Sequence, residues 1–170
     1  MRRIGSIMLA VCFLAAVQIS VRGQGNAENS VDLQVKGISL DSSLARVTRV
    51  LGAPKSRKQS KPAFSECSER RETRLTMNYP GAVLKLIGDG KGRNFKVVSV
   101  SISSSAWPVA NGVAVGSNLR AVESRFGRPL RTENEGGLER LVYFHKDNGG
   151  ATFYFRADKL VRVEWALDLC

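Results

Sequence analysis

Side chains that could carry out catalysis are few in this chain, and their spacing matches no catalytic arrangement. His145 is the only histidine among the 170 residues. Asp147 lies close enough in sequence to influence the pKa of this histidine, but no nucleophile can be paired with it. The run Ser103–Ser105 lacks the G-x-S-x-G turn of a serine hydrolase. Glu133 and Glu135 fall in an expected Gly-rich loop, where a carboxylate lacks the burial that shifts its pKa for acid–base catalysis. We therefore expect a protein that is not an enzyme.

Metal and phosphate chemistry have equally little support. One histidine and three cysteines are too few for a tetrahedral site made only of His and Cys ligands once Cys12 is assigned to a signal peptide, as below. The segment Gly88–Gly92 (GDGKG) fits neither spacing of a phosphate-binding loop, because a strand rather than a helix is expected after it. A glycine-rich hairpin turn is the simpler interpretation. We expect no metal and no cofactor.

The first 23 residues have the composition of a secretory signal peptide. Arg2 and Arg3 precede an apolar run, Ile7–Val21, and small residues stand at the −3 and −1 positions of a cut after Gly23. The run is short for a membrane span, so an uncleaved anchor is the lesser alternative. Cys12 lies inside the run rather than at its end, which disfavours a lipoprotein. We expect an exported protein, periplasmic or extracellular in a bacterium.

Cleavage would leave two cysteines, Cys67 and Cys170, in the mature chain. In an oxidising compartment, two cysteines most simply form one disulfide. Closing a loop of roughly 100 residues stabilises a fold by at most about 4–5 kcal/mol. Two free thiols, or a bridge between two molecules, are the alternatives.

The formal charge of +11 falls to +8 on cleavage, since Arg2, Arg3 and Arg22 leave with the signal. Four basic residues then occur within seven positions after the first expected helix: Lys55, Arg57, Lys58 and Lys61. Such a segment could dock on anionic lipid, lipopolysaccharide or an acidic partner. A solvated basic loop is the simpler interpretation. Nucleic acid is not expected as a partner, because the chain is exported and no aromatic residue is interleaved with these charges.

Two segments of the chain repeat one another. Residues 37–54 (GISLDSSLARVTRVLGAP) and residues 112–129 (GVAVGSNLRAVESRFGRP) share six identities in register. Each has a serine that could cap a helix, Ser42 or Ser117, followed by apolar residues at helical spacing. Each ends in Gly, with Pro two residues later, and both residues stop helices. The repeat therefore predicts two short helices.

Three stretches of alternating apolar residues follow each expected helix, as in strands with one buried face. The expected inward residues after the first helix are Leu75, Met77, Tyr79, Leu84, Leu86, Val98, Val100 and Ile102. Their counterparts after the second helix are Leu141, Tyr143, His145, Phe153, Phe155, Val161, Val163 and Trp165. Turn residues separate the strands, and strands joined by hairpins run antiparallel.

The fold class that this pattern predicts is α+β: two tandem helix–strand–strand–strand repeats that share one antiparallel sheet, with the helices on one face. One repeat of about 60 residues would be marginally stable alone, whereas two can share a core. The expected organisation is a signal peptide (1–23), a polar N-terminal lead (24–36), a first repeat (37–110) and a second repeat (111–170).

Residues that point away from the expected core form the candidate binding surface. In the second repeat they include five side chains of interest: Phe144, Tyr154, Arg156, Arg162 and Glu164. Aromatic and Arg side chains together are typical of protein-binding hot spots. The alternative is that Phe144 and Tyr154 pair across neighbouring strands, and that Arg156 and Glu164 form an ordinary ion pair.

The repeated motif resembles the superfamily of β-lactamase-inhibitor-protein-like domains and SmpA/OmlA outer-membrane lipoproteins. The stretches that carry the resemblance are Gly112–Pro129 with Asp158–Trp165 and, more loosely, Gly37–Pro54 with Val97–Ile102. The resemblance implies a non-enzymatic protein outside the cytoplasm that binds partners across its sheet or loops. The chain departs from the lipoproteins because it has no convincing lipobox.

The function expected from these features is that of an exported protein that binds a protein partner through its exposed sheet face. One alternative is an envelope-associated protein that binds anionic lipid or lipopolysaccharide through the basic segment. A hydrolase inhibitor, implied by the resemblance alone, is the other.

Overall fold

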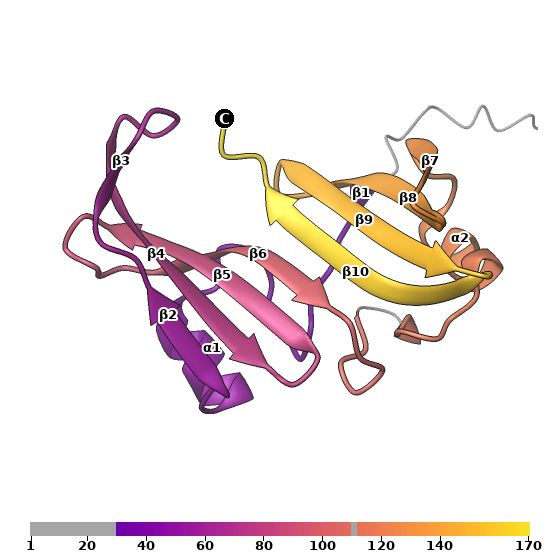
Figure 1. Ribbon diagram of the computed structural model, residues 1–170, viewed down its shortest axis with the longest axis horizontal. Coiled ribbons are helices and arrows are strands. Elements are labelled where there is room, and N and C mark those ends of the chain that lie inside the picture. The colour runs from indigo at the N-terminus through magenta and orange to yellow at the C-terminus, as the bar shows by residue number, and fades with distance from the viewer. Residues whose placement is uncertain (1–29, 110–111) are drawn as a thin grey trace, which may run out of the picture.

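The computed structural model of the protein describes residues 30–109 and 112–170 (Figure 1). The expected signal peptide, residues 1–23, lies outside the described residues. Within them, the chain forms an α+β structure of one ten-stranded mixed sheet and two short helices, α1 (Leu44–Leu51) and α2 (Leu119–Phe126). The strands are β1 (Ser30–Val31), β2 (Ser56–Gln59), β3 (Ala63–Ser65), β4 (Arg70–Tyr79), β5 (Ala82–Asp89), β6 (Lys96–Ile102), β7 (Arg131–Glu135), β8 (Leu138–His145), β9 (Gly149–Arg156) and β10 (Lys159–Leu167).

The sheet consists of two groups of strands that meet at its centre. Its order is β1-β8-β9-β10-β6-β5-β4-β2, with β7 beside β8 and β3 beside β4. β6 ends a first half (37–109), β10 ends a second half (112–170), and these two strands pair antiparallel, with Val100 opposite Trp165. The two halves therefore lie on the left and right of this pair in Figure 1. The expectation of a purely antiparallel sheet is wrong at one place, because β1 runs parallel to β8.

One hydrophobic core lies against one face of the sheet, which we call the inner face. Most of the expected inward residues are buried there, including Leu84, Phe153 and Trp165. Both helices pack against this core through fully buried valines, Val47 of α1 and Val122 of α2. Removal of this apolar surface from water is the main force that holds the halves together. We call the opposite side the outer face.

A tyrosine in each half ties a helix end to the sheet. The Tyr79 hydroxyl donates to the Gly52 carbonyl at 3.1 Å, and the Tyr143 hydroxyl donates to the Gly127 carbonyl at 3.0 Å. The alignment of the repeats in the sequence pairs Tyr79 with His145, so it is wrong by two residues along this strand. The reason is that β8 continues past Tyr143 to pair with β1.

Two β-bulges change which residues face the core. The pairing of β5 with β6 skips Val98, and the pairing of β9 with β10 skips Val161. Val97 and Leu160 are buried in their place. A bulge inserts one residue into a strand and so reverses the alternation beyond it. The expectation that Val98 and Val161 point inward is therefore wrong.

Each helix is capped one residue later than the sequence suggests. The N-cap side chains are Ser43 and Asn118, and each accepts a hydrogen bond from the backbone N–H three residues further on. Ser42 and Ser117 instead accept from the backbone N–H three residues earlier, which stabilises the turn before the helix. The caps predicted at Ser42 and Ser117 are wrong, because a serine can support either arrangement and the sequence does not distinguish them.

The segment expected to be a polar lead, 24–36, is part of the core where the structure describes it. β1 pairs with β8, and Val31, Leu33 and Val35 are almost completely buried. The chain then crosses behind the centre of the sheet toward α1, as Figure 1 shows. The three apolar residues alternate with polar ones, which is a strand signal that the polar neighbours conceal in the sequence. We call residues 32–43, between β1 and α1, the crossing segment. It connects the two halves in addition to the pairing of β6 with β10.

Candidate functional site

The outer face of the second half holds a cluster built around Tyr154. The side chains of β8, β9 and β10 alternate between the core and this face, so Arg140, Tyr154 and Arg162 face outward on three neighbouring strands. The Arg162 guanidinium lies 4.0 Å from the centre of the Tyr154 ring, and the Arg140 guanidinium lies 5.5 Å from it. Both distances suit cation–π attraction. The ring is therefore held between two arginines.

Glu164 completes this cluster and connects it to the other half of the sheet. Its carboxylate accepts a hydrogen bond from the Tyr154 hydroxyl at 2.8 Å and one from the Ser101 hydroxyl of β6 at 3.0 Å. The Arg162 Nε lies 3.4 Å from the same carboxylate. Burial and the hydrogen bond to Glu164 raise the pKa of Tyr154, so its hydroxyl stays protonated and continues to donate. Tyr154, Arg162 and Glu164, predicted separately, thus form one unit.

Phe144 lies on the same face but outside that cluster. It stands opposite Gly150, and its side chain is 44% exposed, so it does not pair with Tyr154 across the strands. An open hollow of about 1230 Å³ covers this region, and Phe144, Glu164 and the exposed Leu130 are among the residues that line it. The hollow brings Phe144 and one member of the Tyr154 cluster into a single concave surface.

Arg156 is placed differently from the other four predicted binding residues. It is exposed at the end of β9, next to the turn Ala157–Asp158. Glu164 forms its ion pair with Arg162, and no ion pair of Arg156 occurs within residues 30–109 and 112–170. The alternative expectation of an Arg156–Glu164 pair is therefore wrong, because Arg162 lies two positions from Glu164 on the same strand face.

Sequence reasoning missed Arg140 and the strand that supports it. Glu133 and Glu135, expected in a loop, lie on β7 and pair with β8. Glu135 forms a hydrogen-bonded ion pair with Arg140, and Glu133 lies 3.5 Å from Arg140 and 2.7 Å from Arg131. The alternating charges before a Gly-Gly pair are the sequence signal of this hairpin. The two carboxylates therefore orient Arg140, and both are engaged in ion pairs rather than available as an acid or a base.

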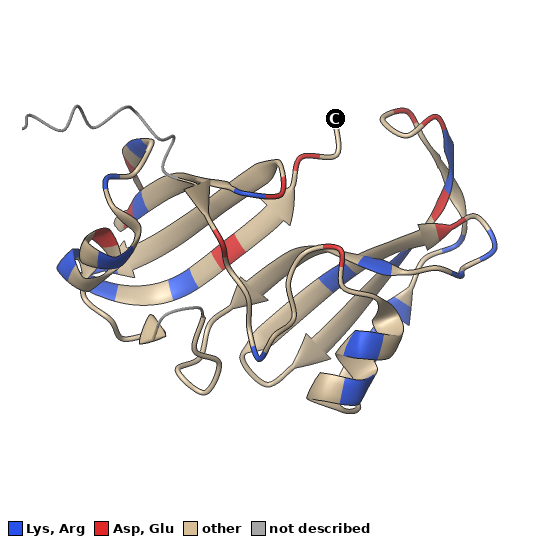
Figure 2. Cartoon of the chain, turned by 180° about the vertical axis from the view of Figure 1, so that it is seen from behind, with Lys and Arg blue, Asp and Glu red and all other residues tan. Residues whose placement is uncertain are grey.

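The basic segment is an edge strand rather than a loop. Residues 56–59 form β2, which pairs with β4 at the end of the sheet. Lys55, Arg57, Lys58 and Lys61 are all exposed, and none forms an ion pair in the part of the chain that the structure describes. Figure 2 shows that basic residues also occur on α1, so positive charge is not confined to β2. Charged side chains on an edge strand prevent edge-to-edge association of sheets, which is a structural reason for their presence.

A disulfide joins Cys67 to Cys170, as predicted, with 5.0 Å between the two Cα atoms. Cys67 lies in the turn of an arm made by β3 and the start of β4 (residues 63–72), and Cys170 ends the tail that follows β10. Figure 1 shows the arm and the tail at the same edge of the molecule. The bond therefore fastens the end of the second half to the first half, across the outer face.

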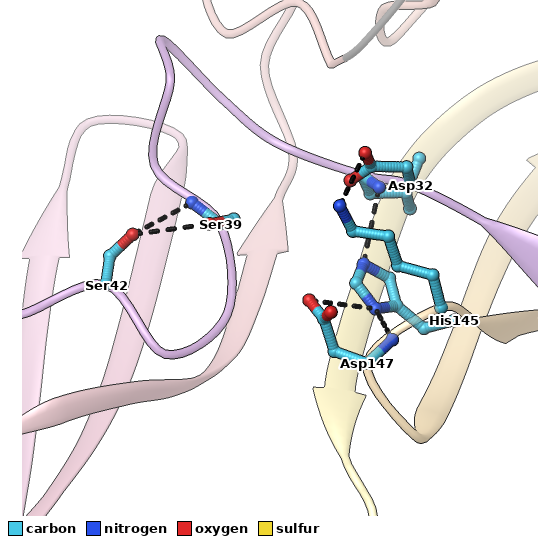
Figure 3. Close-up of polar contacts among 7 residues, drawn as sticks. Asp32, Ser39, Ser42, His145 and Asp147 are labelled. Atoms are coloured by element: carbon cyan, nitrogen blue, oxygen red, sulfur yellow. Dashed lines mark hydrogen bonds and ion pairs between the residues drawn. The ribbon is translucent and has the colours of Figure 1, made fainter.

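His145, the one histidine, has a structural position in the core. Its side chain is fully buried, and its Nε2 accepts a hydrogen bond from the Leu33 N–H at 3.3 Å (Figure 3). Its Nδ1 faces Asp147, whose backbone N–H is 3.3 Å away and whose carboxylate is 3.8 Å away. Burial lowers the pKa of His145, and Asp147 only partly opposes this effect. The neutral ring thus holds the crossing segment against β8.

The remaining candidate motifs have structural explanations. Gly88–Gly92 forms a hairpin turn in which the Asp89 carboxylate accepts from the Lys91 and Arg93 N–H groups, and these bonds, with Arg93 foremost, lower the pKa of Asp89. No group of three or more His, Cys, Asp or Glu side chains suited to a metal occurs among the described residues. Neither α1 nor α2, the helices that the described ranges contain, is long and apolar enough to cross a membrane.

Comparison with known proteins identifies the fold only. No protein-family model matches the chain, and no curated protein matches it either. It is similar in structure to a cysteine-rich secretory protein from Staphylococcus aureus subsp. aureus Mu50, with a TM-score of 0.53 and 11% identity over 84% of this chain and 48% of that one.

Two further structures are similar at lower scores. An extracellular protein containing a SCP domain from Bacillus anthracis str. Ames gives a TM-score of 0.46 and 12% identity over 76% of this chain and 44% of that one. The uncharacterized protein yfeY from Escherichia coli gives 0.43 and 12% over 78% and 95%. The chain thus spans less than half the length of the Staphylococcus and Bacillus proteins, and at these identities the likeness concerns the fold alone.

Proposed function

We propose that this protein is an exported, non-enzymatic binding protein that engages a protein partner through the outer face of β8, β9 and β10. The observation that carries the proposal is the Tyr154 cluster on this face, together with an open hollow that is lined by exposed Phe144 and by Glu164 of the cluster. An aromatic ring fixed between two arginines loses little conformational freedom on binding, and aromatic and Arg side chains dominate protein-binding hot spots.

A binding role rather than catalysis is supported by how the candidate catalytic groups are used. His145 is buried and holds the crossing segment, while Glu133 and Glu135 are engaged by arginines on the sheet. Each group therefore has a structural task that explains its presence.

We further propose that the two halves arose as a tandem repeat. Three pairs of features support this: the Tyr79 and Tyr143 bonds to helix-end glycines, the bulges at Val98 and Val161, and serines before the two helices with the same local hydrogen bond. The similarity to inhibitor-like and SmpA/OmlA repeats stays a prediction.

Export to the periplasm or the extracellular space of a bacterium is part of the proposal. The disulfide supports it, because such bonds persist in oxidising compartments. The Staphylococcus protein with a similar fold is described as secretory, which agrees with this location.

The test is affinity capture from the envelope and culture medium of the source cells. The wild-type protein and a Phe144→Ala/Tyr154→Ala variant serve as baits, and mass spectrometry quantifies the proteins that each retains. We expect one partner whose recovery falls at least tenfold with the variant. Val50→Ala, a truncation of an exposed apolar side chain on α1, is the matched control and should leave recovery unchanged. Equal recovery with all three baits would sink the proposal.

A second candidate function uses the basic segment at β2, because its four exposed cations, two on the strand and two beside it, lack ion pairs within the described chain. An envelope-associated protein would then bind vesicles of anionic lipid, or lipopolysaccharide, in a salt-sensitive manner. Sedimentation with anionic vesicles at low salt should remove the wild-type protein from solution but not a variant in which Lys55, Arg57, Lys58 and Lys61 are changed to Gln. No sedimentation of the wild-type protein would end this candidate.

A further inference from the structure

The outer face of the first half carries a second, smaller cleft, which adjoins the large hollow. Lys85, Ser99, Ala166 and Leu167 line both spaces, whereas Tyr154 lines neither. The volume of the smaller cleft is about 320 Å³, its floor is formed by β4, β5 and β6, and the tail after β10 closes one side. The residues that line it are Arg74, Leu75, Thr76, Lys85, Leu86, Ile87, Val98, Ser99, Ala166, Leu167 and Leu169. A neighbouring hollow of about 490 Å³ beneath the arm shares Arg74, Ile87, Val98, Leu167 and Leu169 with it, so the two spaces are continuous.

Apolar residues line this cleft for identifiable reasons. The bulge in β6 releases Val98 from the inward alternation, and Val98 lines the cleft together with Ile87. Leu167 and Leu169 belong to the end of β10 and the tail, which the Cys67–Cys170 disulfide fastens to the arm. Leu169 remains 47% exposed despite this attachment. The disulfide thus builds one wall of an apolar cleft that water still reaches.

Two cations that form no ion pair with any described residue lie at this cleft. Arg74 lies opposite Ile87 and Lys85 lies opposite Thr76, so the two basic residues are diagonal neighbours on one face, within reach of each other's long side chains. Neither forms an ion pair in residues 30–109 or 112–170, and no Asp or Glu lines the cleft. In the adjoining hollow, by contrast, Arg70 is paired with Glu72, and Lys96 with Asp41. The positive charge at the cleft is therefore uncompensated.

We propose that this cleft binds an anionic amphiphile, namely a free fatty acid: a single acyl chain with a carboxylate head. The carboxylate would lie between Arg74 and Lys85, where the guanidinium can offer two parallel N–H donors. The acyl chain would lie along Ile87, Val98, Leu167 and Leu169. A volume of 320 Å³ falls at the lower end of the range of small-molecule sites, about 300–1,000 Å³, which suits one medium-length chain.

The affinity of the cleft should depend on three features: the charge of the ligand's head group, the length of its acyl chain and the disulfide. Each methylene buried along the chain strengthens binding about fourfold, so laurate binds more tightly than octanoate. Dodecyltrimethylammonium, with the same chain and the opposite charge, does not bind. Loss of the disulfide frees the tail and removes the wall that Leu167 and Leu169 provide, so affinity falls without any change in charge.

The experiment is isothermal titration of the mature protein with laurate below its micelle concentration. We expect one saturable site, at least tenfold weaker binding by Arg74→Gln/Lys85→Gln, and weaker binding by Cys67→Ser/Cys170→Ser. Arg49→Gln/Lys91→Gln removes two exposed cations outside the cleft and leaves affinity unchanged. Circular dichroism of each variant reports whether it is folded, and the charge variant keeps every core residue, so its result stands even where the cysteine variant unfolds.

The proposal would be overturned by no saturable laurate binding, by equal binding of dodecyltrimethylammonium, or by equal affinity of the Arg74→Gln/Lys85→Gln variant and the wild-type protein. Binding to anionic vesicles without binding to free laurate would also overturn it, since it would assign the charge to a membrane surface. Tyr154→Ala should leave laurate affinity unchanged, which separates this site from the proposed protein-binding face.

Discussion

The two halves of the sheet are alike on their inner side and different on their outer side. On the inner side, each has a tyrosine that bonds a helix-end glycine and a bulge near the start of its last strand. On the outer side, the second half has arginines paired with carboxylates around Tyr154, whereas Arg74 and Lys85 of the first half have no such partners among the described residues. Packing restricts the inner residues, since a core is close-packed, but leaves the outer ones free to take different roles.

Truncation of a core side chain in either half should destabilise the whole protein. This is the largest loss of unfolding free energy that we expect. Phe153 is fully buried and lies 5.2 Å from the Phe126 ring and 5.5 Å from the Tyr143 ring, so Phe153→Ala should cost about 3–5 kcal/mol of unfolding free energy. Leu84→Ala in the first half should cost about 2–5 kcal/mol. Urea denaturation followed by tryptophan fluorescence should give one transition for each variant. Two separate transitions would show that the halves do not share a core.

Removing the disulfide tests the connection between the halves. Cys67→Ser/Cys170→Ser should lower the unfolding free energy by about 2–5 kcal/mol, since the bond closes a separation of 103 residues. Hydrogen exchange should increase in the arm (63–72) and the tail, and remain slow in the core strands. Unchanged stability, or faster exchange in the core strands alone, would contradict the position given to this bond.

The two tyrosines form a matched pair. Tyr79→Phe and Tyr143→Phe each remove one hydrogen bond to a glycine carbonyl, so each should cost about 1 kcal/mol by chemical denaturation. Burial raises the pKa of Tyr143 to about 12, with Glu123 adding to the effect. The ultraviolet titration of the Tyr79→Phe variant should therefore show a tyrosinate that forms only near pH 12. A cost confined to one half would show that the two bonds differ in role.

The smallest expected effect is a dependence of stability on pH. It arises in the second half alone, because that half holds the sole histidine. The pKa of His145 is lowered by burial from its ordinary value of 6.5, so the unfolded chain takes up a proton before the folded protein does. Stability is therefore full above about pH 7 and falls as the pH drops through 6.5 toward the folded-state pKa. Asp147, Asp32 and Lys146 are the charged groups nearby.

His145→Gln is the control for this pH dependence, because an amide can still accept from the Leu33 N–H without titrating. Denaturation at pH 7.5 and 5.5 should show a smaller loss of stability for this variant than for the wild-type protein. The same loss in both proteins would assign the pH dependence to carboxylates instead.

How far the sequence predicts the structure differs between inner and outer residues. The inward stripes with Leu84, Phe153 and Trp165, the helix-ending glycines and the disulfide follow from periodicity, turn chemistry and cysteine count. The bulges at Val98 and Val161 do not, because a run of consecutive apolar residues fits either register. β2 and β7 are polar on both faces and so carry no periodic signal of burial.

The outer face is less predictable for a similar reason. Alternation places Tyr154, Arg162 and Glu164 on one face, but their mutual contacts depend on strand register, which the sequence leaves open. The sequence does not predict the role of Arg140, because that role depends on the ion pair with Glu135 of β7. The cleft at Arg74 and Lys85 depends on a bulge, a tail and a disulfide acting together.

The central claim is that the outer face of the second half alone binds the protein partner. The most direct measurement is the dissociation constant of the captured, purified partner for three proteins: wild type, Phe144→Ala/Tyr154→Ala and Arg74→Gln, since Arg74 does not line the large hollow. We expect at least a tenfold increase in the dissociation constant for the Phe144 and Tyr154 variant and no change for the Arg74 variant. Equal affinities of the first two proteins, or a loss confined to the third, would contradict it.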